Sequence, residues 1–196
     1  MATLSKSKTG ARGAAARKIL LAAQQERVVR IRPRKGETRL MTFTTQGRKK
    51  GGLRAGIFGD AYRARPFERI EIIKRGVAPA TVDDIASAMG AGQETVMRRL
   101  GIAKSTLARK RQQGTPLEKD ASELVMGLAT LIGQVETLVS EQGVTEGFDA
   151  AKWFHKWAEE PVPALGGKKP AELLDTKEGQ HVVAGLLEAI RAGAYL

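Results

Sequence analysis

From Pro66 onward, large apolar side chains recur every three or four residues, and glycine or proline interrupts each run. This spacing places the apolar side chains on one face of a helix, whereas a half-buried strand would alternate strictly. The pattern predicts that residues 66–196 are all-α with short connections. The expected helices span 66–76, 81–89, 93–100, 104–112, 115–141, 148–160 and 176–192, with a helical turn at 170–174.

Local signals place several of these helix starts. Pro66 suits a first helical position, Thr81 heads a Thr-x-x-acid capping box, and Thr176 caps the last helix. The predicted inner faces consist of Phe67, Ile70, Ile73 and Val77 in the first helix and of Val182, Val183, Leu186, Leu187 and Ile190 in the last.

The segment Thr115-Pro116-Leu117-Glu118 combines an N-cap residue, a proline at the first position and an acidic capping partner. It predicts the start of the longest helix. The apolar stripe of that helix is close to a heptad seam and consists of Leu117, Leu124, Leu128, Leu131, Val135 and Leu138.

Residues 1–65 differ from the rest of the chain. They carry 17 Lys+Arg against 3 Asp+Glu, a net charge of +14, whereas residues 117–196 carry 7 against 13, a net charge of −6. A strongly basic segment is attracted to polyanions such as nucleic acid. We expect a basic, mostly flexible N-terminal extension, with disorder over 1–18, a weak β-hairpin within 28–45 and a linker at 46–59.

Composition also excludes several classes of protein. The absence of cysteine excludes a disulfide framework and thiol catalysis, and two histidines argue against a His-rich metal site. No run of about 18 apolar residues marks a transmembrane helix, and the apolar run near Ile19 is too short for a signal peptide. We expect a cytoplasmic protein without a cofactor, a metal, a small-molecule substrate or a membrane partner.

Residues 93–114 have the pattern of a helix-turn-helix. Val96, Leu100, Ile102 and Leu107 are spaced to pack two short helices together, and Gly101 permits the sharp turn. The second helix is polar and basic, as a helix that enters a DNA groove must be. The predicted DNA-binding residues are Lys104, Ser105, Thr106, Arg109, Lys110 and Arg111.

This segment resembles the helix-turn-helix of the Xre family of transcriptional regulators. Two positions depart from the family pattern. Met97 replaces a small residue, and Ala103 replaces a common capping serine, which removes a cap that contributes about 0.5–2 kcal/mol.

The C-terminal part contains a second constellation of motifs. A Trp–Pro–Leu-Gly-Gly segment runs from Trp157 to Gly167, a Pro-x-x-Leu-Leu-x-Thr-x-x-Gly segment starts at Pro170, and an Ile-x-x-Gly-x-Tyr segment ends at Tyr195. Their order and spacing resemble the toxin-binding domain of the Xre/MbcA/ParS antitoxins, with Ala158 in place of the usual leucine. The resemblance covers roughly residues 66–196.

The resemblance implies an antitoxin with three parts, namely the extension (1–65), a helix-turn-helix domain (66–116) and a dimerisation and toxin-binding domain (117–196). It implies a homodimer that occludes the active site of a RES-domain toxin, which degrades NAD⁺. It also implies that the dimer represses its own promoter at an inverted-repeat operator. The residues that the resemblance and the loop chemistry suggest for toxin contact are Trp157, Leu165, Gly166, Gly167, Lys168, Lys169, Tyr195 and Leu196.

Two other hypotheses remain open. The chain could be a plain transcriptional regulator whose C-terminal domain only dimerises, or a hydrolase built on His155. The pair His155 and Glu159 lies four residues apart, which on a helix is typical of a surface contact. Because no catalytic order, metal box or nucleotide fingerprint accompanies the pair, we predict that the protein is not an enzyme.

Overall fold

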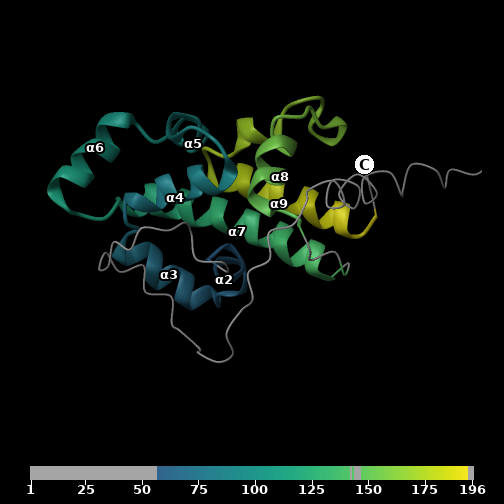
Figure 1. Cartoon of the computed structure of the whole chain (residues 1–196), viewed down its shortest axis with the longest axis horizontal. Coiled ribbons are helices and arrows are strands. Elements are labelled where there is room, and N and C mark those ends of the chain that lie inside the picture. Colours follow the sequence, from purple (N-terminus) through teal and green to yellow (C-terminus); the bar gives the residue numbers. More distant parts are fainter. Residues whose placement is uncertain (1–56, 142, 144–146, 194–196) are drawn as a thin grey trace, which may run out of the picture.

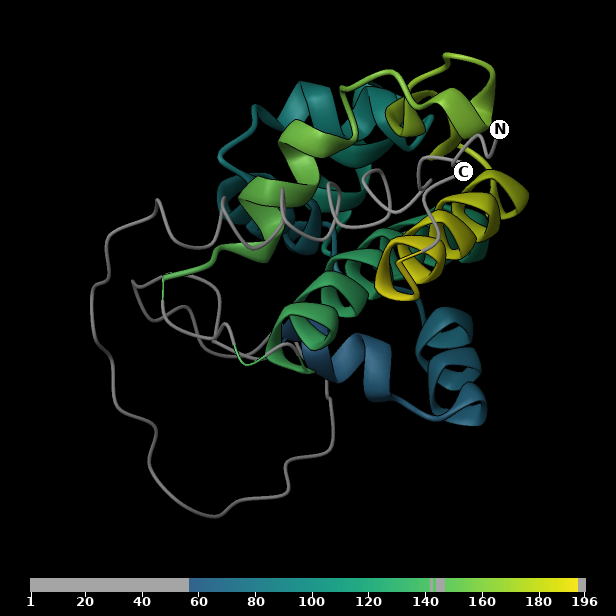
Figure 2. The same ribbon diagram turned by 90° about the vertical axis from the view of Figure 1, so that its right-hand side faces the viewer.

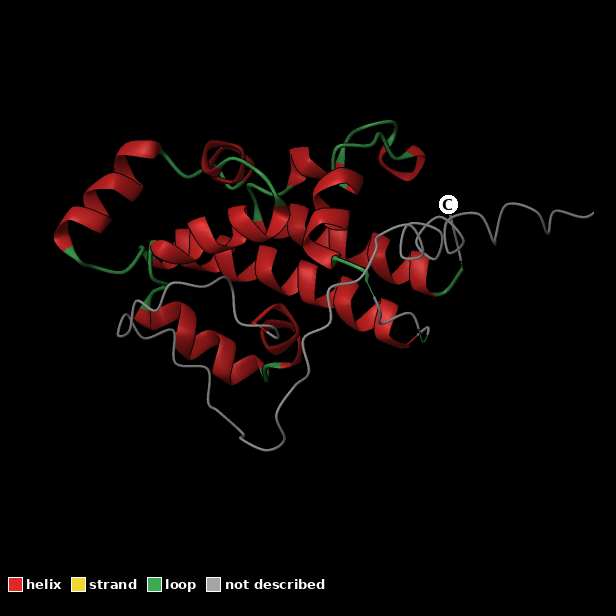
Figure 3. Ribbon diagram, viewed as in Figure 1, coloured by secondary structure: helices red, strands yellow, loops and turns green. Residues whose placement is uncertain are grey.

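The computed structural model describes residues 57–141, 143 and 147–193, and every regular element in these ranges is helical (Figure 3). The all-α prediction is therefore confirmed for this part of the chain. The α-helices are α2 (Ile57–Arg63), α3 (Pro66–Arg75), α4 (Ala80–Met89), α5 (Gln93–Arg99), α6 (Lys104–Gln113), α7 (Lys119–Glu141), α8 (Ala150–Trp157) and α9 (Lys177–Arg191). Two short 3₁₀ turns, η1 (Pro163–Leu165) and η2 (Pro170–Leu173), lie between α8 and α9.

Helix α7 is the central element of the structure. It contacts α2, α3, α4, α8 and α9, and Figures 1 and 2 show α2 and α3 on one side of it and α8 on the other. Its length and apolar composition alone would allow it to cross a membrane, but two thirds of its apolar window is buried inside the molecule. Burial on several sides is the expected state of a core helix.

The heptad-like apolar stripe of α7 is buried by other helices of the same chain. Five of its six members are almost fully buried and Leu124 packs against the same core, so the stripe is not an exposed coiled-coil seam. Here the helix is apolar on more than one face, because helices pack on it from both sides.

The predicted start of this helix is wrong by several residues. The amide of Thr115 donates to the carbonyl of Lys110 at 3.1 Å, which closes α6, and the amide of Leu117 donates to Val77 at 2.9 Å. The hydroxyl of Ser122 joins the same strap, since it accepts from the Val77 amide and donates to the Leu117 carbonyl. Residues 115–118 are therefore a connector, anchored by the buried Leu117, that ties α7 to the loop after α3.

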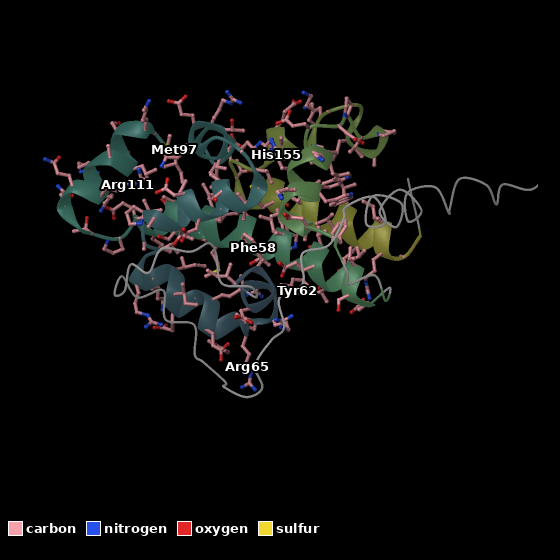
Figure 4. The ribbon with its side chains drawn as sticks, in the orientation of Figure 1. Phe58, Tyr62, Arg65, Met97, Arg111 and His155 are labelled. Atoms are coloured by element: carbon pink, nitrogen blue, oxygen red, sulfur yellow. The ribbon has the colours of Figure 1, made fainter. Side chains whose placement is uncertain are left out.

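The prediction of a flexible linker over residues 46–59 is wrong at its described end. Residues 57–59 belong to α2, whose Phe58 is buried against α7 (Figure 4). A Cβ atom at Gly133 would lie 1.9 Å from the Phe58 carbonyl oxygen, so only glycine allows this approach. The sequence pattern missed α2 because the helix is short and follows a glycine-rich stretch. The other predictions for 1–56, including the hairpin, fall outside the described residues.

Two predicted inner faces are partly wrong. Phe67 and Ile70 on α3 are exposed, and Ile72 is buried in their place, because only one edge of α3 packs on α7. On α9, Val182 is exposed while Val183, Leu187 and Ile190 are buried.

The predicted caps have mixed outcomes. Thr81 lies inside α4 rather than at its cap, because α4 begins at Ala80. Pro66 at the start of α3 is confirmed, and so is Thr176, whose hydroxyl accepts from the Gly179 amide.

Candidate functional site

Helix α6 projects at one end of the molecule, far from α9 (Figure 1). Its N-cap residue, Ala103, provides no side-chain hydrogen bond to the first turn, and the helix buries a single residue, Leu107. The turn between α5 and α6 has the predicted form, with Gly101 at a positive φ of 62°. Helix α5 is therefore anchored in the core, and α6 exposes a polar surface beside it. This is the arrangement that a DNA-binding helix-turn-helix needs.

Ion pairs supply the rest of the attachment of α6. Lys104 pairs with Glu94 of α5 at 2.6 Å, and Lys110 pairs with Glu118 at 2.5 Å. Hydrogen bonds from these lysines hold the pKa of each glutamate below its usual value. These two lysines therefore have partners within the chain.

Arg111 of α6 is held in the same way. It pairs with Asp83 of α4 at 2.5 Å, and Asp83 also accepts a hydrogen bond from Gln93 of α5. Asp83 thus joins all three helices. Figure 4 shows Arg111 on α6.

The outward stripe of α6 is different. Ser105, Ala108, Arg109 and Gln112 follow helical spacing, are exposed, and make no ion pair within the described residues. Thr106 is half-buried beside Leu107. The predicted DNA-binding set, chosen as the polar and basic residues of the second helix, did not include Gln112. Its spacing of seven from Ser105 is the signal that would have found it.

The second candidate surface is the loop between α8 and η2, which we call the crown (residues 161–169). Gly166 and Gly167 both have positive φ, at 65° and 83°, so the chain reverses there without strain. The loop is closed by hydrogen bonds from Val162 to the Lys168 carbonyl and from Gly167 to the Val162 carbonyl. It is exposed at Gly166, Gly167 and Lys168, whereas Leu165 is half-buried.

The crown stands on an aromatic base. Trp157 is buried and stacks on Trp153, with ring centroids 5.6 Å apart. Trp157 therefore supports the crown from within the core, and its ring is not part of the exposed surface. Tyr195 and Leu196, the other predicted contact residues, lie outside the described residues.

An ion network below the crown was missed at the sequence level. The carboxylate of Glu159 binds Arg99 of α5 at 2.6 Å through one oxygen and Lys169 of the crown at 3.2 Å through the other. The Arg99 hydrogen bond is the main cause of a lowered pKa at Glu159. The position of Arg99, three residues after the buried Val96, places a charge on the apolar face of α5 and is the signal that could have found it.

His155 lies on α8 and is half-buried. Burial, and then the charge of Arg99, lowers its pKa, and its Nδ1 has no hydrogen-bond partner among the described residues. Glu159 is engaged by Arg99 and Lys169 instead. Figure 4 shows His155 on α8, and no group of three potential metal ligands occurs in the described ranges.

Comparison with known proteins agrees with both surfaces. Residues 68–129 match the antitoxin Xre-like helix-turn-helix domain, and residues 144–193 match the antitoxin Xre/MbcA/ParS C-terminal toxin-binding domain. The Prs ADP-ribosylating antitoxin of Sphingobium sp. (strain YBL2) is 43% identical over 134 residues, which cover 68% of this chain and 84% of that protein.

The chain belongs to the Xre family of antitoxins.

Membership in the family assigns the two surfaces in outline. An Xre antitoxin has a helix-turn-helix, which implies DNA as a partner, and a toxin-binding domain, which implies a toxin. In this chain α5 and α6 lie in the first matched segment, and the crown lies in the second.

Proposed function

We propose that this antitoxin neutralises a RES-type toxin that consumes NAD⁺ and does so by covering the toxin's active site with the crown. The exposed Gly166-Gly167-Lys168 turn supports this most directly, because it is a closed, projecting loop in the toxin-binding domain. A complex of ordinary specificity would bury about 800 Å² on each partner. The chain itself is proposed to be non-enzymatic and cytoplasmic.

The name of the Sphingobium relative adds chemical support. It refers to ADP-ribosylation, a transfer that breaks the same nicotinamide–ribose bond of NAD⁺ as NAD⁺ hydrolysis does. A toxin that hydrolyses NAD⁺ and one that transfers ADP-ribose to a protein would therefore both bind NAD⁺ at their active sites. We retain hydrolysis as the proposal, and an assay for both products would distinguish the two.

The test uses the full chain, co-expressed with the RES-domain protein encoded beside it and purified at high salt. Lys168→Glu is expected to weaken the complex, because Lys168 projects from the crown. Lys156→Glu makes the same charge change at an exposed site on α8, outside the crown, and should leave the complex intact. Equal retention of the toxin by both variants would contradict occlusion by the crown.

We further propose that the antitoxin represses its own promoter as a dimer. Two-fold symmetry predicts an inverted repeat with half-sites about one helical turn apart. The outward stripe of α6 would face base edges, whereas Lys110 and Arg111 would act mainly by fixing α6 in place. Arg109→Ala should relax operator specificity, as measured by binding to operator and scrambled DNA, with Lys119→Ala as an exposed control outside α6.

We propose that the dimer forms through α3, because the stripe of α7 is already buried within one chain. Phe67 is 83% exposed and lies three residues before Ile70, which is also exposed, and α3 carries Glu68 in its first turn and Lys74 and Arg75 in its last. Two copies of α3 packed antiparallel would place acid against base around this apolar pair. Phe67→Ser should shift the protein to a monomer in analytical ultracentrifugation, whereas Val182→Ser, on α9, should not.

The alternative is a plain regulator whose C-terminal domain only dimerises. The Lys168→Glu variant separates the two proposals, because it leaves the buried Val183 and Leu187 of α9 in place. Under the antitoxin proposal this variant loses the toxin and keeps its affinity for the operator, and under the alternative the unmodified chain binds no toxin at all.

A further inference from the structure

Arg99 combines deep burial with incomplete pairing. It is the last residue of α5, and its side chain is 4% exposed. One nitrogen, Nη2, donates to Glu159, while Nε and Nη1 are buried without a hydrogen-bond partner among the described residues. A buried guanidinium with a single carboxylate depends strongly on it, because removing that carboxylate would leave a buried charge uncompensated.

Glu159 is shared between two parts of the molecule. Its Oε1 accepts from Arg99 of the helix-turn-helix and its Oε2 accepts from Lys169 at the base of the crown. Next to it, the Ala171 amide donates to the Ala158 carbonyl at 2.9 Å, which closes the base of the loop. A displacement of Glu159 would therefore be transmitted directly to the base of the crown.

Packing connects the same two parts. Helix α5 lies against η2, which follows the crown, and Gly101 lies beside Asp175, whose Cβ is 3.5 Å from the position of an added Cβ. The helix-turn-helix and the crown are thus one packed unit, although they belong to two matched domains.

A second ion pair, between α5 and α6, provides an internal comparison. Lys104 and Glu94 are also 2.6 Å apart, but their side chains are 75% and 73% exposed. Solvent screens such a pair and hydrates either partner when the other is removed. Although both ion pairs have the same N–O distance, loss of the buried Arg99–Glu159 pair should disturb the structure more than loss of the exposed Lys104–Glu94 pair.

We propose that Arg99 is a positioning residue of the toxin-binding crown. It holds Glu159, and Glu159 holds Lys169 and the loop base, so that a residue of the helix-turn-helix determines the shape of the surface offered to the toxin. This inference rests on the proposed binding of the toxin by the crown. By linkage, a toxin that changes the Glu159 network would change the affinity for operator DNA by the same factor as DNA changes the affinity for the toxin.

The test measures two quantities in the full-length protein. The first is affinity for the RES-domain protein encoded beside it, by titration. The second is amide hydrogen exchange of the crown and of α7. The variants are Arg99→Gln, Glu159→Gln and the double variant, and Lys104→Gln is the matched control.

Arg99→Gln and Glu159→Gln are each expected to weaken toxin binding by about tenfold, the scale of an interaction between residues in one hydrogen-bond network. The double variant should weaken it no further, because both changes remove one link. Crown amides such as Gly167 should exchange faster in these variants while α7 remains protected. Lys104→Gln should change toxin affinity less than twofold.

Two results would overturn the proposal. One is unchanged crown exchange and toxin affinity in Arg99→Gln, a variant that removes the buried charge and leaves Glu159 where water hydrates it, so that it is expected to fold even if Glu159→Gln does not. The other is exchange that rises throughout α7 as well, which would mark a general loss of stability. If the unmodified protein fails to bind the toxin, the proposed function fails, and the exchange measurement alone still decides whether Arg99 positions the crown.

Discussion

Helices α6 and α7 follow one another in the chain but are held in opposite ways. Helix α7 buries twelve residues among five neighbouring helices, whereas α6 buries only Leu107 and is otherwise fixed by ion pairs to Glu94, Glu118 and Asp83. A helix that is held by burial has little exposed surface left with which to bind a partner. Ion pairs add to the attachment of α6 at its sides, although solvent screens the exposed Lys104–Glu94 pair, and they leave an outward stripe available to DNA. Their contribution depends on pH and salt.

The largest expected effect is in α7. Leu128→Ala removes a side chain with no exposed surface and should lower the free energy of unfolding by about 2–5 kcal/mol. Chemical denaturation would measure it. Ser105→Ala on the outward stripe of α6 is the control and should change stability within about 0.5 kcal/mol. Equal losses of unfolding free energy in the two variants would contradict the proposed difference between α6 and α7.

Gly133→Ala probes the packing of α2 on α7. The added Cβ would meet the Phe58 carbonyl at 1.9 Å, and backbone cannot move aside as a flexible side chain does. We expect a loss of about 1–3 kcal/mol or more and faster amide exchange in α2. Gly185→Ala, where nothing lies within 4 Å of the new atom, should be neutral or stabilising.

Leu107→Ala tests whether one apolar residue anchors α6. Leu107 is 1% exposed, as buried as the core leucines, but α6 buries no other residue, so we expect α6 to detach without unfolding α7. The loss of global stability should therefore be smaller than for Leu128→Ala, about 1–2 kcal/mol, while exchange protection is lost along α6. A loss of protection in α7 as well would show that the two helices unfold together.

The smallest effect is expected from acidification. The pKa values of Glu94 and Glu118 are lowered by their lysine partners, so the folded protein binds fewer protons there than the unfolded chain does. Their stabilisation is present above the ordinary value of 4.5 and is lost as the pH falls through the lowered values. NMR should show α6 loosening below pH 4.5 before α7 does. Prior loss of α7 signals would count against ionic anchoring.

The local signals in the sequence were sufficient for much of the fold. Helical spacing, Pro66 and Thr176 determined the all-α class and several helix starts, because these signals act within a single turn of the chain. The glycine at 101 and the apolar residues around it likewise determined the helix-turn-helix. The crown motif was recognisable because its proline and glycine residues dictate a loop wherever the loop lies.

Only the tertiary structure decided which polar groups meet. Thr115 and Leu117 have the local chemistry of a helix start, but the Val77 carbonyl and the end of α6 use their amides instead. Arg99 and Glu159 are 60 residues apart, and no local pattern pairs them. Helices and turns can be predicted from the sequence because the interactions that favour them join residues within a few positions of one another. The partner of a buried charge cannot, because it depends on which side chains the folded core brings together and shields from water.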